Sequence, residues 1–406
     1  ERITQVFVGA VIDGYRDRHD FSLGGSGGSI DVMQFLLPKP ACRKWSGWAD
    51  PQIRIRITTF ETITGYAMAN QRRGIALTPM ETRRKVIVEM AILADDLGYE
   101  LFSVPEGWGF DSTLVLTEIA LKTRQITVMS GILSVWGRTA GTIAMNAATL
   151  ADISNGRYVL GLGASTKALV EGFHAVPFDK PTRRFRQTVR AVRSILDGER
   201  APVPDEVDSR PLKLGQPAQP DLPIYLAGLG PQSVRAAAQL ADGWFPYLVT
   251  RDRFQTWVPD ILRTRRRAGR VDDPFTVVAG PNISVNNDEA AARQVVASNL
   301  AWYVSAMGDA YANSITNQGY ADEVAGIKAA NPKPHPANGV VPGEADHLLD
   351  QLAAYGPPEK VREMVAAWDN AVDINAIGIP PGLPWEQIEA AIRVGAPTYA
   401  AGRSSL

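Results

Sequence analysis

From Gly74 onward, short apolar runs of the strand type alternate with longer segments whose apolar residues recur at helical spacing. Eight such runs are each followed by a helix-like segment: Gly74–Thr78, Leu101–Val104, Ile126–Met129, Tyr158–Leu160, Ile224–Ala227, Gly243–Tyr247, Thr276–Ala279 and Asp373–Ile379. Repeated strand–helix units imply a parallel sheet. Eight of them favour a closed (β/α)8 TIM barrel, whose catalytic residues lie at the carboxyl ends of the strands.

An open, doubly wound sheet is the alternative arrangement of these units. Its nucleotide fingerprint is Gly-x-Gly-x-x-Gly after the first strand. Here the glycine pairs follow later strands, and no third glycine occupies the expected place after Gly163. We therefore favour the barrel, with insertions at Trp136–Thr142, Pro202–Asp221 and Ala310–Gly356 that carry no recognisable motif. Ala310–Gln351 is expected to be irregular in part, because four prolines interrupt it.

Two strands end in glycine-rich loops that suit a phosphate-bearing cofactor. Tyr158–Leu160 runs into Gly161-Leu162-Gly163-Ala164-Ser165, and Ile224–Ala227 runs into Gly228-Leu229-Gly230-Pro231. Glycine allows a tight turn and close approach of the backbone to a ligand. A helix that starts directly after such a loop presents free backbone N–H groups to an anion. We predict that both loops contact one cofactor, through Gly161, Gly163, Ala164, Ser165, Gly228, Leu229 and Gly230.

Residues 1–67 differ in character from the rest of the chain. They include the linker-like Gly24–Gly28 and a Trp-rich polar stretch, and Met68 reads like a natural start directly before the first strand. We expect residues 1–67 to be a largely disordered extension outside any domain, and residues 68–406 to form the barrel domain. The alternative is a small cap that uses Ile53–Ile57 as an edge strand.

Bulk properties exclude several classes of function. The net charge of −1 gives no reason to expect nucleic acid or an anionic membrane as a partner, and one cysteine fits a cytoplasmic protein. No apolar run reaches the roughly 20 residues that a bilayer requires. The four histidines form no metal-ligand motif, so we expect no metal site.

Several segments in order resemble the bacterial luciferase-like flavin- and F420-dependent oxidoreductases. They are Ala91–Glu100, Ala144–Asp152 with Gly156–Gly163, Pro177–Asp179, Pro223–Pro231 with Ala241–Trp244, and Gly356–Val361. The resemblance covers about residues 74–397. It implies a TIM barrel that often forms homodimers and binds FMN or coenzyme F420 at its C-terminal mouth, with a small-molecule substrate. The sequence of Leu160–Leu169 resembles the F420-dependent branch more closely than the FMN-dependent one.

The resemblance also implies roles for single residues. In the F420-dependent branch the third strand ends in a non-prolyl cis peptide that backs the deazaflavin ring, and the matching residues are Ser130, Gly131 and Ile132, with the cis bond at Gly131-Ile132. Many relatives end the second strand with an acid and a histidine. Here the acid is Glu106, our candidate for acid–base catalysis, but Gly107 stands in the place of the histidine.

The resemblance leaves three functions open. The leading one is F420-dependent hydride transfer to or from an unidentified small molecule. The alternatives are an FMN-dependent monooxygenase, which would also need a partner flavin reductase, and a non-catalytic flavin-binding relative. A barrel enzyme that acts on a phosphorylated metabolite without flavin is a further reading of the glycine loops.

Other conspicuous residues have plain structural interpretations as well as functional ones. Trp108 and Trp136 are candidates to wall the pocket, and Arg138 is a candidate to balance a ligand charge. His174 is expected to be structural. The basic cluster of Arg263, Arg265, Arg266 and Arg267 is expected to be a solvated helix face.

Overall fold

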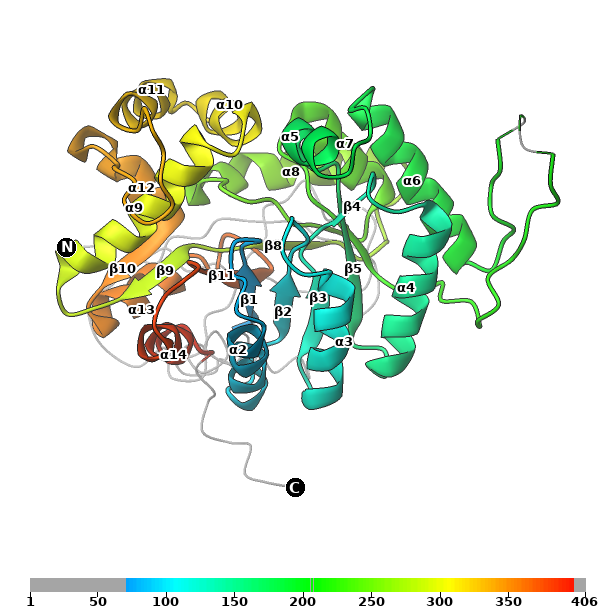
Figure 1. Ribbon diagram of the computed structural model, residues 1–406, viewed down its shortest axis with the longest axis horizontal. Helices are drawn as coiled ribbons and strands as arrows, with labels where there is room; N and C mark the ends of the chain where they lie inside the picture. The colour runs from blue at the N-terminus through cyan, green and yellow to red at the C-terminus, as the bar shows by residue number, and fades with distance from the viewer. Residues whose placement is uncertain (1–70, 205, 207, 398–406) are drawn as a thin grey trace, which may run out of the picture. The chain divides into compact units, whose positions relative to one another are not determined.

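The computed structural model describes residues 71–397, except 205 and 207. Our expectations for residues 1–67 therefore lie outside the described residues. The described chain forms a closed barrel of eight parallel strands surrounded by helices (Figure 1). The strands are β1 (Arg73–Leu77), β2 (Leu101–Val104), β3 (Thr127–Ser130), β5 (Tyr158–Gly163), β6 (Ile224–Leu226), β7 (Gly243–Trp244), β8 (Thr276–Ala279) and β11 (Ile374–Ile379). All eight predicted strands are confirmed.

The barrel closes because the first strand pairs with the last. The order around the barrel is β1-β2-β3-β5-β6-β7-β8-β11, and β1 pairs with β11 in parallel from Arg73 opposite Asn375 to Leu77 opposite Ile379. Inside it, large apolar side chains form one layer: Leu101, Met129, Val159, Tyr225, Val278 and Ile374. This layer fills the interior below the carboxyl ends of the strands.

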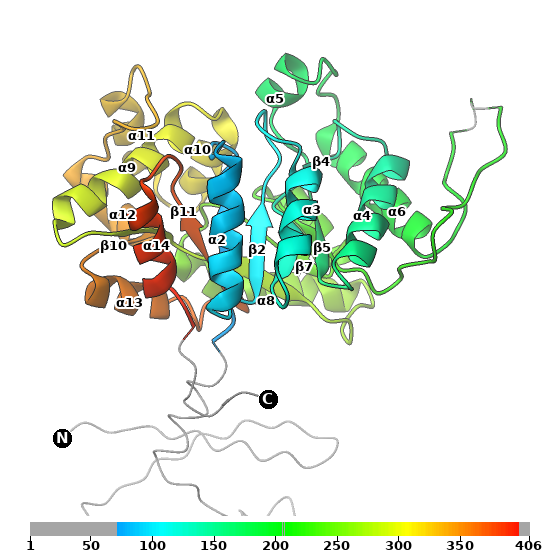
Figure 2. The ribbon, with the colours of Figure 1, turned by 60° about the horizontal axis from the view of Figure 1, so that its bottom comes forward.

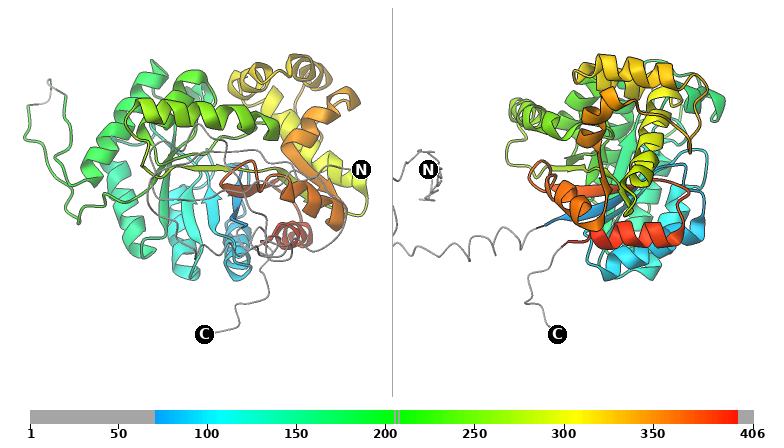
Figure 3. Two further views of the ribbon diagram at one scale, coloured as in Figure 1. Left: turned by 180° about the vertical axis from the view of Figure 1, so that it is seen from behind. Right: turned by 90° about the vertical axis from the view of Figure 1, so that its left-hand side faces the viewer.

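Helices follow the strands as predicted and cover the barrel (Figure 3). They are α2 (Arg84–Asp96), α3 (Ser112–Lys122), α4 (Ala140–Ile153), α5 (Lys167–Gly172), α6 (Pro181–Leu196), α7 (Pro231–Leu240), α8 (Arg251–Arg267), α13 (Pro358–Ala366) and α14 (Trp385–Val394). Local caps fix several ends. Asp111 and Thr139 accept hydrogen bonds from first-turn N–H groups of α3 and α4. Gly198, after α6, has a φ of 84°, which suits glycine.

One insertion builds a second, smaller layer beside the barrel. After β8 the chain enters β9 (Asn282–Val285), which pairs in parallel with both β11 and β10 (Ala353–Gly356). Between these strands lie α9 (Glu289–Ser305), α10 (Asp309–Asn317), α11 (Ala321–Ala330), η1 (Gly343–Ala345) and α12 (Asp346–Leu352). Figure 1 shows this yellow-to-orange group on one side of the barrel. Ala310–Gln351 is irregular in part, as expected: residues 331–342, which hold the four prolines, form no helix or strand, whereas the helices around them pack on a cluster of their own that includes Leu300, Ile315 and Leu348.

The segment between α6 and β6 projects from the barrel without regular structure, as Figures 1 and 2 show. It contains the predicted Pro-rich insertion. In the basic cluster of α8, Arg263, Arg266 and Arg267 are exposed as expected, but Arg265 is only 2% exposed, which corrects the expectation for that residue. Its guanidinium donates to the carbonyl oxygens of Ala238, Ala241, Asp273 and Pro274, so it ties α7 and α8 together.

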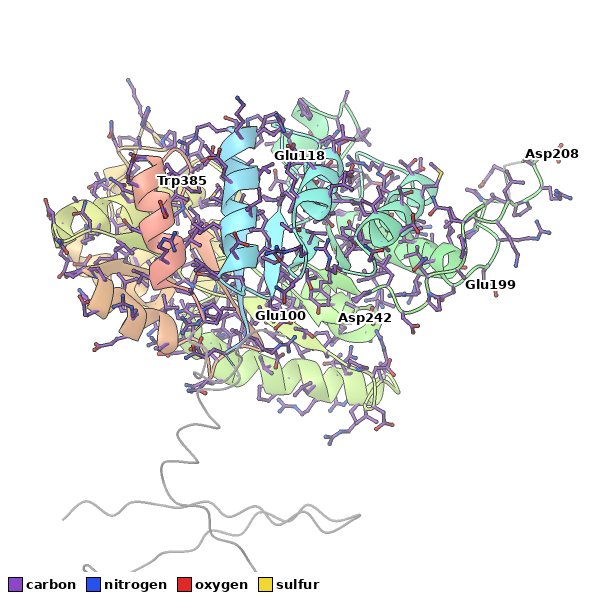
Figure 4. The ribbon with its side chains drawn as sticks, turned by 90° about the horizontal axis from the view of Figure 1, so that it is seen from below. Glu100, Glu118, Glu199, Asp208, Asp242 and Trp385 are labelled. Carbon is purple, nitrogen blue, oxygen red and sulfur yellow. The ribbon has the colours of Figure 1, made fainter. Side chains whose placement is uncertain are left out.

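Ion pairs gather at the end of the barrel where the strands begin. Glu100, before β2, accepts from Arg72 at 2.6 Å. Asp242, before β7, pairs with Arg193 at 2.7 Å and with Arg270 at 2.9 Å. Figure 4 labels both acids near the strand starts, whereas its labelled Glu118 and Trp385 lie on the outer helices α3 and α14. These pairs stabilise the amino-terminal face and leave the opposite face for chemistry.

Candidate active site

A cavity of about 460 Å³ opens at the carboxyl ends of the barrel strands. Its wall includes Gly163, Ala164 and Ser165 after β5, and Gly228, Leu229 and Gly230 after β6. The two glycine loops therefore share one cavity, as the sequence predicts. In Figure 2 the arrowhead of β2 points toward this end of the barrel, where α5 and α10 lie.

Small residues make the floor of the cavity. At and just after the strand ends, glycine and alanine residues line the cavity beside the larger Leu77, Pro105 and Phe245: Ala76, Gly131, Gly163, Ala227, Gly280, Ala376 and Gly378. TIM barrels usually fill such a level with bulky branched side chains. Their replacement by small residues leaves room for a flat ligand across the top of the barrel.

The β3–β4 connection forms one wall, with Gly131 and Ile132 facing the cavity between β3 and β4 (Leu133–Ser134). The described residues contain no cis peptide bond, so the predicted cis bond at Gly131-Ile132 was wrong. A trans bond avoids a cost of ~3 kcal/mol. It still lets Gly131 N–H donate to Val104 O at 2.8 Å and Ile132 O accept from Glu106 N–H at 3.1 Å. A side chain at Gly131 would lie 2.7 Å from the Pro105 backbone, so glycine is required there.

Ser130 and Gly161 lie behind this wall and do not line the cavity. The Ser130 hydroxyl accepts from Gly161 N–H at 2.8 Å and lies 3.1 Å from Gly161 O. Any side chain at Gly161 would fall 1.9 Å from Ser130 O. The two residues therefore lock β3 against β5 and position the wall.

The glycine loops present hydrogen-bond donors to the cavity. Ser165 has a φ of 58°, and the hydroxyls of Ser165, Thr166 and Ser233 belong to lining residues. Helix α7 starts at Pro231 with Gly230 as its N-cap and no side-chain cap. Its first-turn N–H groups therefore suit an anion. Gly228 lets this turn close, because a side chain there would lie 2.9 Å from Ser233.

Glu106 contacts the cavity and is held by an ion pair. Its Oε1 accepts from Arg138 and its Oε2 accepts from Ser134 N–H at 3.2 Å. Arg138 also pairs with Asp111 at 2.8 Å. Burial acts to lower the pKa of Arg138, but the carboxylates of Glu106 and Asp111 outweigh it and raise that pKa. Arg138 thus places a cation at the wall beside Glu106.

The opposite wall was not predicted from the sequence. It consists of Tyr247 after β7, Asn282 at the start of β9, and Tyr303 and Tyr311 from α9 and α10. The Tyr247 hydroxyl accepts from Asn299 Nδ2 at 2.9 Å and donates to Asn282 Oδ1 at 3.2 Å. These residues have no local motif, because Tyr247 comes from the loop after β7 and the others come from separate elements of the insertion. The only sequence signal was the spacing of Asn313 and Asn317, which puts both on one face of α10.

The remaining candidates have distinct places. Trp108 lines the mouth and is 47% exposed, whereas Trp136 is buried and donates to Ala164 O at 2.9 Å. His174 lies against Gly137 outside the cavity, with Nε2 buried and without a hydrogen-bond partner among the described residues. Glu106 is the one charged residue that lines the cavity within the described chain.

The sequence model of the luciferase-like monooxygenase family matches residues 64–373. This chain belongs to that family. A putative coenzyme F420-dependent oxidoreductase of Mycobacterium tuberculosis is 29% identical over 307 residues, covering 70% of this chain and 87% of the relative. A 5,10-methylenetetrahydromethanopterin reductase of Archaeoglobus fulgidus is 27% identical over 282 residues, covering 67% and 82%.

The solved structure of the coenzyme F420-dependent tetrahydromethanopterin reductase from Methanopyrus kandleri shares the fold. It matches with a TM-score of 0.65 at 23% identity, over 80% of this chain and 98% of that structure. The luciferase-like barrel and an oxidoreductase class of enzyme are thereby confirmed. None of the described helices is long and apolar enough to cross a bilayer. Within the same residues, no group of three or more His, Cys, Asp or Glu side chains is placed to hold a metal ion.

Proposed function

We propose that this luciferase-like protein is an F420-dependent oxidoreductase that transfers a hydride between the deazaflavin and a small-molecule substrate. The observation that carries the proposal is that the Gly131-Ile132 wall and both glycine loops line one cavity. The relatives whose names include F420, or a reductase that acts on a pterin, support F420 over FMN.

The residues present fit the coenzyme. The glycine and alanine floor and the Ile132 side chain offer a flat, apolar seat for a tricyclic ring. No Lys or Arg of the described chain lines the cavity, so a phosphate tail would rest on N–H groups and hydroxyls. The α7 N-terminus, Ser165 and Thr166 provide both, whereas the Ser233 hydroxyl already donates to Gly230 O at 2.9 Å. When bound, the deazaflavin supplies a carbon that gives or accepts a hydride.

The chain's own residues would orient the ring, exclude water and handle a proton. Trp108 covers one side of the mouth. Glu106 remains our prediction for an acid–base residue. Both of its oxygens already accept hydrogen bonds, so we expect it to act as an acceptor. A proton donor for the substrate then has to come from elsewhere in the cavity.

Equilibrium titration with F420 and FMN, followed by ligand fluorescence, tests the proposal. We expect F420 to bind at least about tenfold more tightly than FMN, which is about 1.4 kcal/mol. Gly163→Ala should weaken F420 binding, because the new methyl group would lie 3.0 Å from Ile132 Cδ1. The control Gly141→Ala meets nothing closer than 3.9 Å and should bind normally. FMN-dependent oxygen uptake would instead favour the monooxygenase, and failure to bind F420 would end the proposal.

A further inference from the structure

Three tyrosines and two asparagines form a chamber at the side of the cavity away from the glycine loops. This tyrosine chamber consists of Tyr247, Asn282, Asn299, Tyr303 and Tyr311. Its rings pack edge to face, with centroids 4.8 Å apart for Tyr247 and Tyr303 and 4.9 Å apart for Tyr303 and Tyr311. Such rigid packing makes a defined surface rather than an adaptable one.

Polar atoms of the chamber have unused hydrogen-bonding capacity. Asn299 Oδ1 is buried without a partner among the described residues. At the end of β1, Thr78 lines the cavity and is 4% exposed. Its hydroxyl lies near that of Tyr303 but makes no hydrogen bond of ordinary geometry. Asn299 does not line the cavity, so of these two residues Thr78 alone can meet a ligand there. Because buried polar groups normally have partners, its hydroxyl indicates that a hydrogen-bonding ligand completes the site.

The chamber and its rim are uncharged. Asn313, Ser314 and Asn317 of α10 line the cavity beside it, and the one charged lining residue, Glu106, follows β2. Taking an unpaired ionised group into such a site costs several kcal/mol. A substrate that enters the chamber should therefore be neutral over its buried part.

The chamber faces the predicted ring seat across the barrel. In the closed order β1-β2-β3-β5-β6-β7-β8-β11, β3 and β8 stand four strands apart, which is the opposite side of an eight-stranded barrel. Ile132 follows β3, and Asn282 follows β8 after a two-residue link. Gly378 of β11 makes room for Asn282, because a side chain there would lie 2.4 Å from Asn282 Oδ1. A molecule held in the chamber therefore lies across the cavity from Ile132 and can reach the ring seat from that side.

We propose, building on the F420-dependent function above, that the tyrosine chamber binds an uncharged ketone, aldehyde or alcohol and that the Tyr247 hydroxyl meets its reacting oxygen. In reduction, the deazaflavin, when bound, would supply a hydride to the carbonyl carbon, and the C=O π pair would move to oxygen. The oxygen would take the Tyr247 proton, and the hydroxyl would give up its hydrogen bond to Asn282 Oδ1 in order to donate to the substrate. The second proton of the reduced coenzyme would go to water, and water would return one to Tyr247. Alcohol oxidation is the reverse.

The surroundings of Tyr247 suit this role. Burial raises its pKa to about 12, so the phenol is protonated at neutral pH. Asn299 Nδ2 donates to the phenol oxygen and would stabilise the negative charge that develops there. Loss of a positioned proton donor typically costs about 10²- to 10⁴-fold in rate.

A matched pair of probes tests whether the chamber prefers a neutral ligand to a charged one. 4-Oxocyclohexanecarboxamide and 4-oxocyclohexanecarboxylate have nearly the same size and differ in charge. Calorimetric titration into the F420-loaded protein should show the amide binding at least about tenfold more tightly, a difference of about 1.4 kcal/mol. Equal or tighter binding of the carboxylate would overturn the inference.

Placing a cation at the rim should reverse this preference. Asn317 is exposed and lines the cavity, and Thr316 is exposed on the same helix but does not line it. Asn317→Arg should tighten carboxylate binding relative to the amide, while the matched control Thr316→Arg should behave like the unmodified protein. An unchanged ratio in Asn317→Arg would show that the probes bind elsewhere.

Tyr247→Phe keeps the ring and removes the hydroxyl. We expect kcat for F420-linked reduction of the amide probe to fall about 100-fold, while F420 affinity stays the same. The control Tyr320→Phe lies outside the cavity and should leave both unchanged. Normal kcat in Tyr247→Phe would overturn the inference and leave the F420 function standing. Failure of the unmodified protein to bind F420 would defeat the function itself.

Discussion

Arg138 is the residue on which the wall at Glu106 depends. Its side chain and that of Glu106 are 13% and 8% exposed. Arg138→Met would leave the Glu106 carboxylate with Ser134 N–H as its one remaining partner among the described residues. Breaking a buried pair from one side costs about 3–5 kcal/mol, so we expect a loss of about 3 kcal/mol in the free energy of unfolding by urea.

The pair of Arg124 and Asp96 provides the control for this prediction. Their side chains are 77% and 57% exposed, so Arg124→Met should cost less than about 1 kcal/mol. Adding Glu106→Gln to Arg138→Met should recover part of the loss, because a neutral amide is cheaper to bury. Equal effects of Arg138→Met and Arg124→Met would show that the buried pair contributes nothing special.

The tyrosine chamber predicts a loss of stability in alkali. Burial raises the pKa of Tyr247 from 10.0 to about 12, and it also raises the pKa values of Tyr303 and Tyr311. A raised tyrosine pKa stabilises the fold below the unfolded value, and this contribution is lost as pH rises through the folded value. Between pH 10 and 12, each such tyrosine should therefore cost about 1.4 kcal/mol per pH unit.

Tyr247→Phe removes one of these contributions. Its unfolding free energy should fall less steeply above pH 10 than that of the unmodified protein, and the tyrosines common to both proteins cancel in the comparison. Urea unfolding at a series of pH values measures the two slopes. Parallel curves would show that Tyr247 ionises at the same pH in the folded and unfolded chains.

At the scale of elements, Gln318 ties α10 to the loop after β7. Its Oε1 accepts from Thr250 N–H at 2.8 Å, and its Nε2 donates to Leu248 O at 3.2 Å. Gln318→Leu would leave both backbone groups buried without partners, which costs about 1–3 kcal/mol each. We expect about 3 kcal/mol less stability and faster hydrogen exchange in α10. The exposed control Thr316→Leu should stay within about 0.5 kcal/mol, and normal exchange in Gln318→Leu would contradict this anchoring role.

The insertion that carries α10 also contains elements and site residues that could not be predicted from the sequence. The eight barrel strands were predictable because each is a short apolar run followed by an amphipathic helix. Strand β10 was not, since Ala353–Gly356 has little strand propensity and follows α12 without a turn. The glycine loops could be predicted as one side of the cavity, because their glycines are closely spaced directly after predicted strands. The tyrosine chamber could not be predicted in this way, because Tyr247 and Tyr311 meet only through the packing of α9 and α10.

At the scale of the whole molecule, closure of the barrel requires only described strands. β1 begins at Arg73 and pairs along its whole length with β11, and Arg73 also donates to Asp369 and to the carbonyls of Gly395 and Ala396. The first strand is therefore held in place by contacts with β11 and with residues near the end of the described chain. We propose that residues 68–406 are the catalytic domain and that residues 1–67 are not needed for its fold.

A chain that starts at Met68 tests this proposal. Its thermal midpoint should stay within about 1 °C of that of the full chain, which for a domain of this size is under about 1 kcal/mol. F420 affinity should be unchanged, because every residue that lines the cavity follows Leu77 or lies in β1. A second truncation that starts at Ala76 removes three residues of β1 and the Arg73 contacts, so it should not fold. If the chain from Met68 also fails to fold, residues 1–67 belong to the structure of the domain.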